Sequence, residues 1–439
     1  MFPTITFDFS FFSNIVNEIL SSKTPLDAVW IVLKIGGWIP LAYLLLWAAK
    51  EIYLINIRNK WGRKQKFVLL AIDVPKGNEQ SPKAVESIFS NLCGAKASST
   101  FKKKWVEGRF NLSFSLEMVS HGGDIRFYIR APLKHRDLVE ASVFSQYPDA
   151  AIVEAEDYAK DFPRKFPNDN YKIFGCDFKQ DRDFIYPIRT YPVFEHSLSG
   201  EFKDPASLLM ETLGKIDKKQ WVCLQIIVTP SGDDWRKAGM VKLQKLLGKT
   251  VKEKKTMLGE AVGGVAGLAH EMVAYATGFG SEADPYKKDK KDDPLKMLNM
   301  SPGERRVLEN IEYKLAKIGL ISKIRYMQFG PPETFSPKYY EIKGYLRQFA
   351  ALDSNGFGAV KSTLTKADYF WEQWLLSAKQ RALMKSYIQR DSQRGGPTYP
   401  LNVEELATIW HFPDIGVKAP LVKKTEAKRA EPPRGLPIR

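Results

Sequence analysis

The residues best suited to chemistry lie near the C-terminus, where cations and aromatic rings share one predicted helix, 370–390. Basic side chains contact phosphates, and aromatic rings stack on bases. At helical spacing, however, Trp371, Trp374 and Leu375 also suit a core-facing stripe with solvated cations on the other side. The helix and the residues just after it therefore supply seven candidate nucleic-acid contacts, namely Lys379, Arg381, Lys385, Arg390, Arg394, Trp371 and Trp374.

No other motif predicts a reaction. Gly248-Lys249-Thr250 has the end of a phosphate-binding loop, but Leu243 stands where that motif requires glycine. An acidic group at 154–161, which contains Asp157, is typical of a solvated face. The sequence thus predicts no catalytic residue and no cofactor, and we expect a protein that is not an enzyme.

Cysteine and histidine usage excludes a disulfide framework and a metal site. The three cysteines, Cys93, Cys176 and Cys223, are scattered, and the five histidines lie at no metal-ligand spacing. Free cysteines are typical of a reducing compartment.

An apolar run at 28–49 is the element from which we predict where in the cell the protein lies. Its only charged residue is Lys34, and its length matches the ~20 residues of a membrane-spanning helix. A cleaved signal peptide has a shorter apolar core. A buried helix of a soluble core is the other alternative, which is favoured by Lys34, Gly36, Gly37 and Pro40. We expect a transmembrane helix.

Charge on either side of this run predicts its orientation. The extracytoplasmic N-terminus, 1–27, is weakly acidic, whereas residues 50–66 carry six cations against Glu51. Positive flanks remain in the cytoplasm. We therefore expect a single-pass protein of the inner membrane, with its N-terminus outside and its main body in the cytoplasm.

Residues 67–158 predict a ferredoxin-like βαββαβ domain. A buried strand at 67–74 precedes a helix that begins at Ser81-Pro82. Alternating apolar residues at 109–119 and 124–131 flank the turn at 121–123, which indicates a hairpin. A helix at 133–147 and a strand at 150–158 complete the order.

The rest of the chain predicts a second α/β domain at 171–330 with a flexible insertion at 249–300. Ser301 and Glu304 form a capping box that begins a helix at 301–320. A helical region, 331–413, and a basic, proline-rich tail, 414–439, follow. The expected fold class is α+β: an N-terminal transmembrane helix, one or two ferredoxin-like units, and a C-terminal helical, basic segment.

The net charge of +16 points to an acidic partner, such as nucleic acid, a membrane surface or an acidic protein. Hydrophobic residues make up 44% of the chain, enough for extensive cores.

Several stretches resemble a membrane-anchored family from small-genome bacteria, similar to the N-terminal, non-ATPase half of type IV secretion or conjugative DNA-transfer ATPases. They are 105–158, 190–196 (TYPVFEH), 301–304 (SPGE), 401–413 (LNVEELATIWHFP) and 432–437 (PPRGLP). In that family the last stretch precedes a phosphate-loop ATPase domain, whose motifs are absent here. The resemblance implies a role beside an ATPase supplied by another chain.

The leading hypothesis is a membrane-anchored, non-catalytic component of a type IV secretion-like DNA-transfer machine. The partners we expect are the membrane and a phosphate-loop ATPase or secretion subunit, with DNA and a second copy of the chain as further candidates. The alternative is a membrane scaffold of envelope or pilus assembly without a nucleic-acid role. An enzyme at the membrane is a third hypothesis, which nucleotide hydrolysis by the purified chain would reveal.

Overall fold

The computed structural model describes residues 24, 27, 34, 38–74, 78, 80–97, 100–194, 203–248, 300–367 and 369–414. The chain divides into two compact units, one from 1–65 and 97–110 and the other from 66–96 and 111–439. The insertion expected at 249–300 and the tail expected at 414–439 lie outside the described residues, except for residues 300 and 414.

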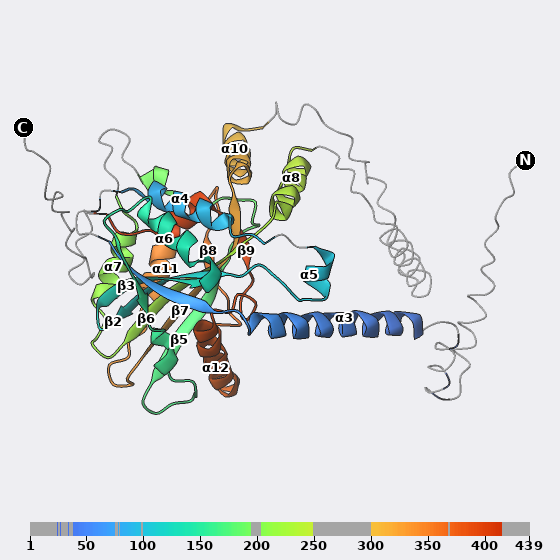
Figure 1. Ribbon diagram of the computed structural model, residues 1–439, viewed down its shortest axis with the longest axis horizontal. Coiled ribbons are helices and arrows are strands. Elements are labelled where there is room, and N and C mark those ends of the chain that lie inside the picture. The colour runs from blue at the N-terminus through green and yellow to red at the C-terminus, as the bar shows by residue number, and fades with distance from the viewer. Residues whose placement is uncertain are drawn as a thin grey trace, which may run out of the picture. The chain divides into compact units, whose positions relative to one another are not determined.

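The first unit contains α3 (Trp38–Gly62) and α5 (Phe101–Trp105) (Figure 1). The segment after α5 packs on α3, and the rings of Trp61 and Phe110 lie 5.0 Å apart. Gly108, at φ +68°, allows this approach, since a Cβ there would meet the carbonyl carbon of Ile57 at 2.6 Å.

The predicted transmembrane helix at 28–49 is wrong. No helix among the described residues has an apolar stretch long enough to cross a membrane. α3 begins at Trp38 and continues past Ala49 through Lys50, Glu51 and Arg58. The uncharged residues 38–49 are therefore only the first half of a longer helix whose second half is charged. Residues 28–33 and 35–37 lie outside the described part of the chain.

The second unit is built on one nine-stranded sheet in which every strand pairing is antiparallel. The strand order is β4-β1-β3-β2-β6-β7-β5-β8, and β9 pairs with β7. The strands are β1 (Phe67–Asp73), β2 (Phe114–His121), β3 (Asp124–Pro132), β4 (Ala151–Ala155), β5 (Lys172–Gln180), β6 (Trp221–Pro230), β7 (Gly319–Gly330), β8 (Phe357–Ala359) and β9 (Tyr399–Asn402).

The predicted ferredoxin-like fold class is therefore also wrong, although the strands and the hairpin turn at 121–123 are confirmed. Residues 67–158 do not close as a separate unit, because β2 pairs with β6 along its whole length, from Phe114↔Val228 to His121↔Trp221. Both strands are buried on both faces, so an unpaired edge at either would expose apolar residues and backbone donors.

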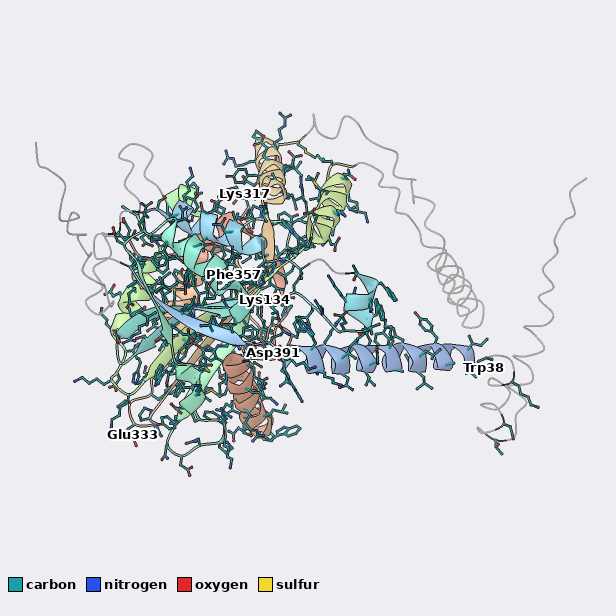
Figure 2. All side chains as sticks on the ribbon, in the orientation of Figure 1. Trp38, Lys134, Lys317, Glu333, Phe357 and Asp391 are labelled. Atoms are coloured by element: carbon teal, nitrogen blue, oxygen red, sulfur yellow. The ribbon has the colours of Figure 1, made fainter. Side chains whose placement is uncertain are left out.

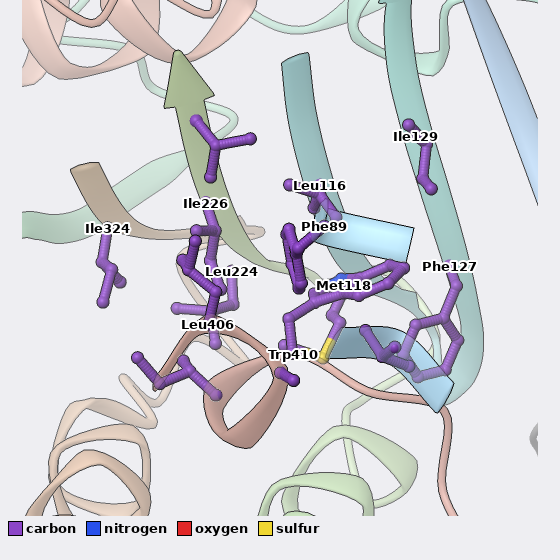
Figure 3. Packing of buried hydrophobic residues seen from close by; sticks show 14 of the residues in the cluster. Phe89, Leu116, Met118, Phe127, Ile129, Leu224, Ile226, Ile324, Leu406 and Trp410 are labelled. Carbon is purple, nitrogen blue, oxygen red and sulfur yellow. The ribbon is translucent and has the colours of Figure 1, made fainter. Parts of the chain in front are cut away.

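One face of the sheet carries the largest core, which is covered by α4 (Pro82–Cys93), α6 (Arg136–Phe144), α7 (Ala206–Gly214), α11 (Tyr339–Arg347) and α13 (Val403–Ile409). In the close view, Phe89, Phe127 and Trp410 meet between strands and helices (Figure 3). Trp410 comes from the far end of the described chain, yet its ring lies 5.9 Å from that of Phe127 on β3.

The opposite face is covered by α12 (Gln373–Gln389), which Figure 1 labels, and by the 3₁₀ turn η3 (Tyr158–Asp161). Elsewhere in this unit, α8 (Asp234–Leu246) and α10 (Pro302–Ala316) pack through Leu243, Ile311 and Leu315. The capping box of Ser301 and Glu304 at the start of α10 is confirmed.

Candidate functional site

A row of polar side chains crosses the sheet face beneath α12. Glu117 on β2 pairs in register with Gln225 on β6, which pairs with Arg325 on β7, which pairs with Asp177 on β5. The residues directly before and after each of them along its strand belong to the apolar core on the other face. All four are buried, and burying charge is costly unless each group has a partner.

Arg325 is the centre of this row. Its Nε donates to Asp177 Oδ1 at 2.8 Å, and its Nη1 donates to Gln225 Oε1 at 3.1 Å and to the Ser386 carbonyl at 2.8 Å. Its Nη2 donates to the carbonyls of Asp391 and Arg394 at 3.1 and 3.2 Å. These contacts use all the N–H groups that a guanidinium has.

A second arginine, Arg390, occupies the end of α12 and is just as fully paired. It donates to both oxygens of Glu117 at 2.9 and 3.3 Å and to both oxygens of Asp157 at 2.7 and 2.8 Å. Asp157, expected on a solvated face, is therefore the half-buried partner of a buried arginine, with 30% of its side chain exposed. Glu117, Asp157, Asp177, Arg325 and Arg390 together form what we call the buried ion cluster.

The cluster shifts the pKa values of its carboxyl groups. Burial alone would raise the pKa of Glu117, but the charge and hydrogen bonds of Arg390 lower it below its ordinary value. Hydrogen bonds from Ser115 at 2.6 Å and from the Tyr158 hydroxyl at 2.5 Å act in the same direction. Asp157 follows the same pattern, with burial opposed by Arg390. Both carboxyl groups are therefore ionised at neutral pH.

The loop 391–396 is held on the sheet by its backbone. Lys323 on β7, which lies 3.6 Å from Asp177, donates to the carbonyls of Ser392 and Arg394. The Gly396 N–H donates to Asp177 Oδ2 at 2.7 Å. Gly395 has φ +93°, and a Cβ there would lie 2.1 Å from Asp177 Oδ2, so this position requires glycine.

A cavity of about 470 Å³ lies between α12, the turn at 360–363 and the loop 391–396. Asp177 and Arg325 are among its lining residues, so the buried ion cluster borders it. Its other polar lining includes Lys379, Arg394, Ser362 and Thr363, and its apolar lining comprises Ala378, Ala382, Leu383 and the glycine at 395.

The structure separates the predicted nucleic-acid contacts into three groups. Lys379 and Arg394 line the cavity. Trp374, 73% exposed, Arg381 and Lys385 lie on the solvent side of α12, so a core-facing role for Trp374 is wrong. Arg390 is buried in the ion cluster and is not accessible to phosphate. The side chain of Trp371 lies outside what the structure describes.

Arg381 is positioned by one contact, from its Nη1 to the carbonyl of Phe166 at 2.7 Å. Two further aromatic residues, Tyr369 and Phe370, are 58% and 80% exposed just before α12. They belong to the same surface but were not among the seven predicted contacts. We call Tyr369, Phe370, Trp374, Arg381 and Lys385 the α12 surface.

Sequence reasoning missed Glu117, Asp177, Gln225 and Arg325. Their signal is a polar residue flanked on both sides by apolar residues of a strand, as in LEM, CDF, LQI and IRY. Such a residue must face a partner if its strand is buried on both faces. The sequence does not show which residues meet, because the four strands are far apart along the chain.

The described residues offer little for nucleophilic or metal chemistry. Burial raises the pKa of Cys223 to about 12 and that of Cys93 to about 11, so neither is a thiolate at neutral pH. No group of three or more His, Cys, Asp or Glu side chains within the described ranges is arranged to hold a metal ion. The arrangement presents exposed rings and cations beside a cavity.

Comparison with known proteins identifies the family but no activity. The model of a domain of unknown function, DUF8128, matches residues 74–311, more than half of the chain, so the chain belongs to this family. The matched range includes Glu117, Asp177 and Gln225 but ends before Arg325 and α12. No curated protein matches the chain.

Proposed function

We propose that this member of the DUF8128 family is a non-catalytic adaptor of a type IV secretion-like DNA-transfer machine. It binds single-stranded DNA along the α12 surface and docks an ATPase that another chain supplies. The observation that carries the proposal is the exposure of Phe370, 80%, just before α12 and of Trp374, 73%, on the helix that also presents Arg381 and Lys385.

Exposed rings beside cations suit an unpaired strand better than a duplex. Bases of a single strand are free to stack on aromatic side chains, whereas in a duplex they are already stacked. Large exposed aromatic side chains cost free energy in a monomer, and their grouping marks an interaction surface. The buried ion cluster fixes the C-terminal end of α12 against the sheet.

Docking is supported by the unit that contains α3. The exposed apolar residues of α3 lie all round the helix instead of forming one stripe. A helix that is apolar on all sides is normally covered by other molecules. The exposed residues on α3 are Trp38, Ile39, Tyr43, Leu44, Leu45, Leu46, Trp47, Ile52, Tyr53 and Ile55 (Trp38 is labelled in Figure 2).

The DNA half of the proposal is tested by fluorescence anisotropy of a labelled oligo-dT with the full chain over a range of salt. We expect binding that weakens steeply with salt. Trp374→Ala should weaken binding by roughly tenfold, because stacking on one aromatic side chain contributes ~1–3 kcal/mol. Lys385→Gln should also reduce the slope of affinity against salt.

Two variants control for general effects of substitution. Tyr340 is an exposed aromatic residue on α11, 76% exposed, and Lys219 is an exposed lysine before β6. Tyr340→Ala and Lys219→Gln should leave the affinity unchanged. Equal losses in the α12 variants and in these controls would contradict a site on α12, and no binding at low salt would contradict DNA binding altogether.

The docking half is tested by capturing the tagged chain from its native cells and identifying the co-purified proteins. We expect a phosphate-loop ATPase, and we expect Leu46→Asp to remove it, because a carboxylate on an apolar interface is costly to bury. Recovery of no motor ATPase and no secretion component would contradict the proposal.

A scaffold without a nucleic-acid role is the second candidate, and the burial of Arg390 favours it. That cation neutralises Glu117 and Asp157 and is unavailable to phosphate. The scaffold predicts capture of assembly proteins together with indifference to oligo-dT at low salt. An inner-membrane location stays a prediction, which fractionation of the native cells would check.

A further inference from the structure

We propose that the cavity beside α12 binds a single nucleotide unit, with the phosphate at Lys379 and Arg394 and the base against Ala378, Ala382 and Leu383. Where the nucleotide is part of a strand, the inference rests on the proposed function. The phosphate-bearing nucleotide could equally be free in solution, and the experiment below distinguishes these sources.

The cavity matches a nucleotide in size and in chemistry. Its volume of about 470 Å³ lies in the range of small-ligand sites, ~300–1,000 Å³. A nucleotide has an anionic end and a flat, largely apolar ring. The lining offers cations and hydroxyl groups for the first and alanine and leucine side chains for the second.

The cations that line the cavity can bind a phosphate without first breaking a strong ion pair. Lys379 has no carboxylate within ion-pair distance among the described residues. Within the described part of the chain, the one ion pair of Arg394 is with Asp391, at 3.2 Å, and its side chain is 54% exposed, so that pair is weak. Ser362 is an exposed hydroxyl donor on the same cavity.

The one carboxylate on the lining does not repel an anion strongly. Asp177 receives the Arg325 Nε at 2.8 Å and the Gly396 N–H at 2.7 Å, and Lys323 lies 3.6 Å away. The same contacts hold the backbone of loop 391–396, so the wall that carries Arg394 is formed before a ligand arrives. Preformed sites avoid the entropy cost of ordering a loop.

The cavity continues the α12 surface. Trp374, Ala378 and Ala382 are spaced four residues apart, so they form one row along the helix. Ala378 and Ala382 line the cavity, and Trp374 is exposed at the start of the same row. A strand whose base stacks on Trp374 can therefore place another nucleotide in the cavity.

The test uses the full chain with three probes: thymidine monophosphate, thymidine and labelled oligo-dT. We expect the monophosphate to bind, thymidine to bind at least tenfold more weakly, and inorganic phosphate to compete, since charge-assisted contacts supply much of the affinity. Lys379→Gln and Arg394→Gln should each weaken monophosphate binding about tenfold. Lys219→Gln is the matched control.

The Ala382→Phe variant tests the cavity without changing any charge. Ala382 is exposed on α12, so a larger side chain fills the cavity without entering the core. We expect this variant to lose monophosphate binding while its thermal unfolding remains that of the wild type. Trp374→Ala should leave monophosphate binding intact and weaken oligo-dT alone.

The outcomes separate the two proposals. Monophosphate binding that depends on the cavity, without oligo-dT binding, supports the inference with a free nucleotide as the source and contradicts DNA binding. Oligo-dT binding that depends on Trp374 but not on Lys379, Arg394 or Ala382 leaves the proposed function standing and overturns the inference. Equal affinity for thymidine and its monophosphate overturns the phosphate contact.

Discussion

At the scale of single residues, the unusual feature is an arginine in a conformation that normally favours glycine. Arg390 has φ 51° and ψ 44°, and it ends α12 in the left-handed position that closes a helix. A non-glycine residue there costs ~1 kcal/mol. Its bonds to Glu117 and Asp157 offset this cost, and they also direct the chain into the loop that forms a wall of the cavity.

Glu117→Gln tests the importance of this pairing. The variant keeps the shape of the side chain but removes a charge that faces Arg390 in a buried site. We expect a loss of ~1.5–3 kcal/mol in the free energy of unfolding, the usual contribution of hydrogen bonds to a charged group, because Arg390 keeps its second carboxylate partner, Asp157. Urea unfolding followed by circular dichroism measures it.

The matched control is Glu333→Gln, at an exposed glutamate between β7 and α11 that Figure 2 labels. It should change stability by less than ~0.5 kcal/mol. If the two variants unfold at the same urea concentration, Arg390 does not depend on Glu117.

At the scale of elements, the C-terminal helix α13 is joined to α7 through one histidine. The His411 ring contacts the Ala407 carbonyl at 3.0 Å through Nδ1 and Asp204 Oδ1 at 2.9 Å through Nε2. Asp204 in turn accepts from the Ala206 N–H at 2.7 Å, at the start of α7. Because both ring nitrogens face acceptors, the doubly protonated imidazolium satisfies both contacts.

This pair predicts a pH dependence of stability. Burial would lower the pKa of His411, but the charge of Asp204 raises it above its ordinary value near 6.5. The pair of His411 and Asp204 therefore stabilises the fold fully below the ordinary pKa of 6.5. This stabilisation is lost as the pH rises through the raised pKa that His411 has in the folded state. The pKa of Asp204 is lowered despite burial, so its contribution is present above about 3.8 and is lost in stronger acid.

We therefore expect the wild type to lose more stability than His411→Gln between pH 6 and pH 9, as measured by urea unfolding at a series of pH values. The His411→Gln variant has no titrating group at this position, so its pH dependence shows the contribution of all the other groups. Parallel curves for the two proteins over that range would show that the ion pair contributes nothing.

At the scale of the whole molecule, the sheet of the second unit is continuous and its core is shared, so we expect this unit to unfold as one cooperative body. The β2–β6 pairing joins the first four strands to the rest. Trp410 and Phe412 pack against Phe127 at 5.9 and 5.2 Å between ring centroids, although they are nearly 300 residues away along the chain.

A fragment of residues 66–170 should therefore fail to fold alone. It lacks the partner strand of β2 and the aromatic residues that fill the core above β3. We expect no cooperative thermal transition by circular dichroism and strong binding of a hydrophobic dye, whereas residues 66–414 should unfold in a single transition. A cooperative, native-like transition of the short fragment would contradict a shared core.

The sequence by itself determined the local elements. Alternation and turn residues predicted β1, the β2–β3 hairpin and the helix opened by Ser301, because these depend on neighbours within a few residues. It also identified the aromatic and basic helix whose exposed residues we propose as the binding surface.

Only the tertiary structure decided how these elements combine. The alignment of Glu117, Gln225, Arg325 and Asp177 requires four strands to pair in one register, and strand pairing depends on contacts distant in sequence. For the same reason, the sequence did not distinguish the buried Arg390 from the exposed Lys385 on one helix. Burial of a charge depends on whether other elements bring it a partner, and Glu117 and Asp157 come from elsewhere in the chain.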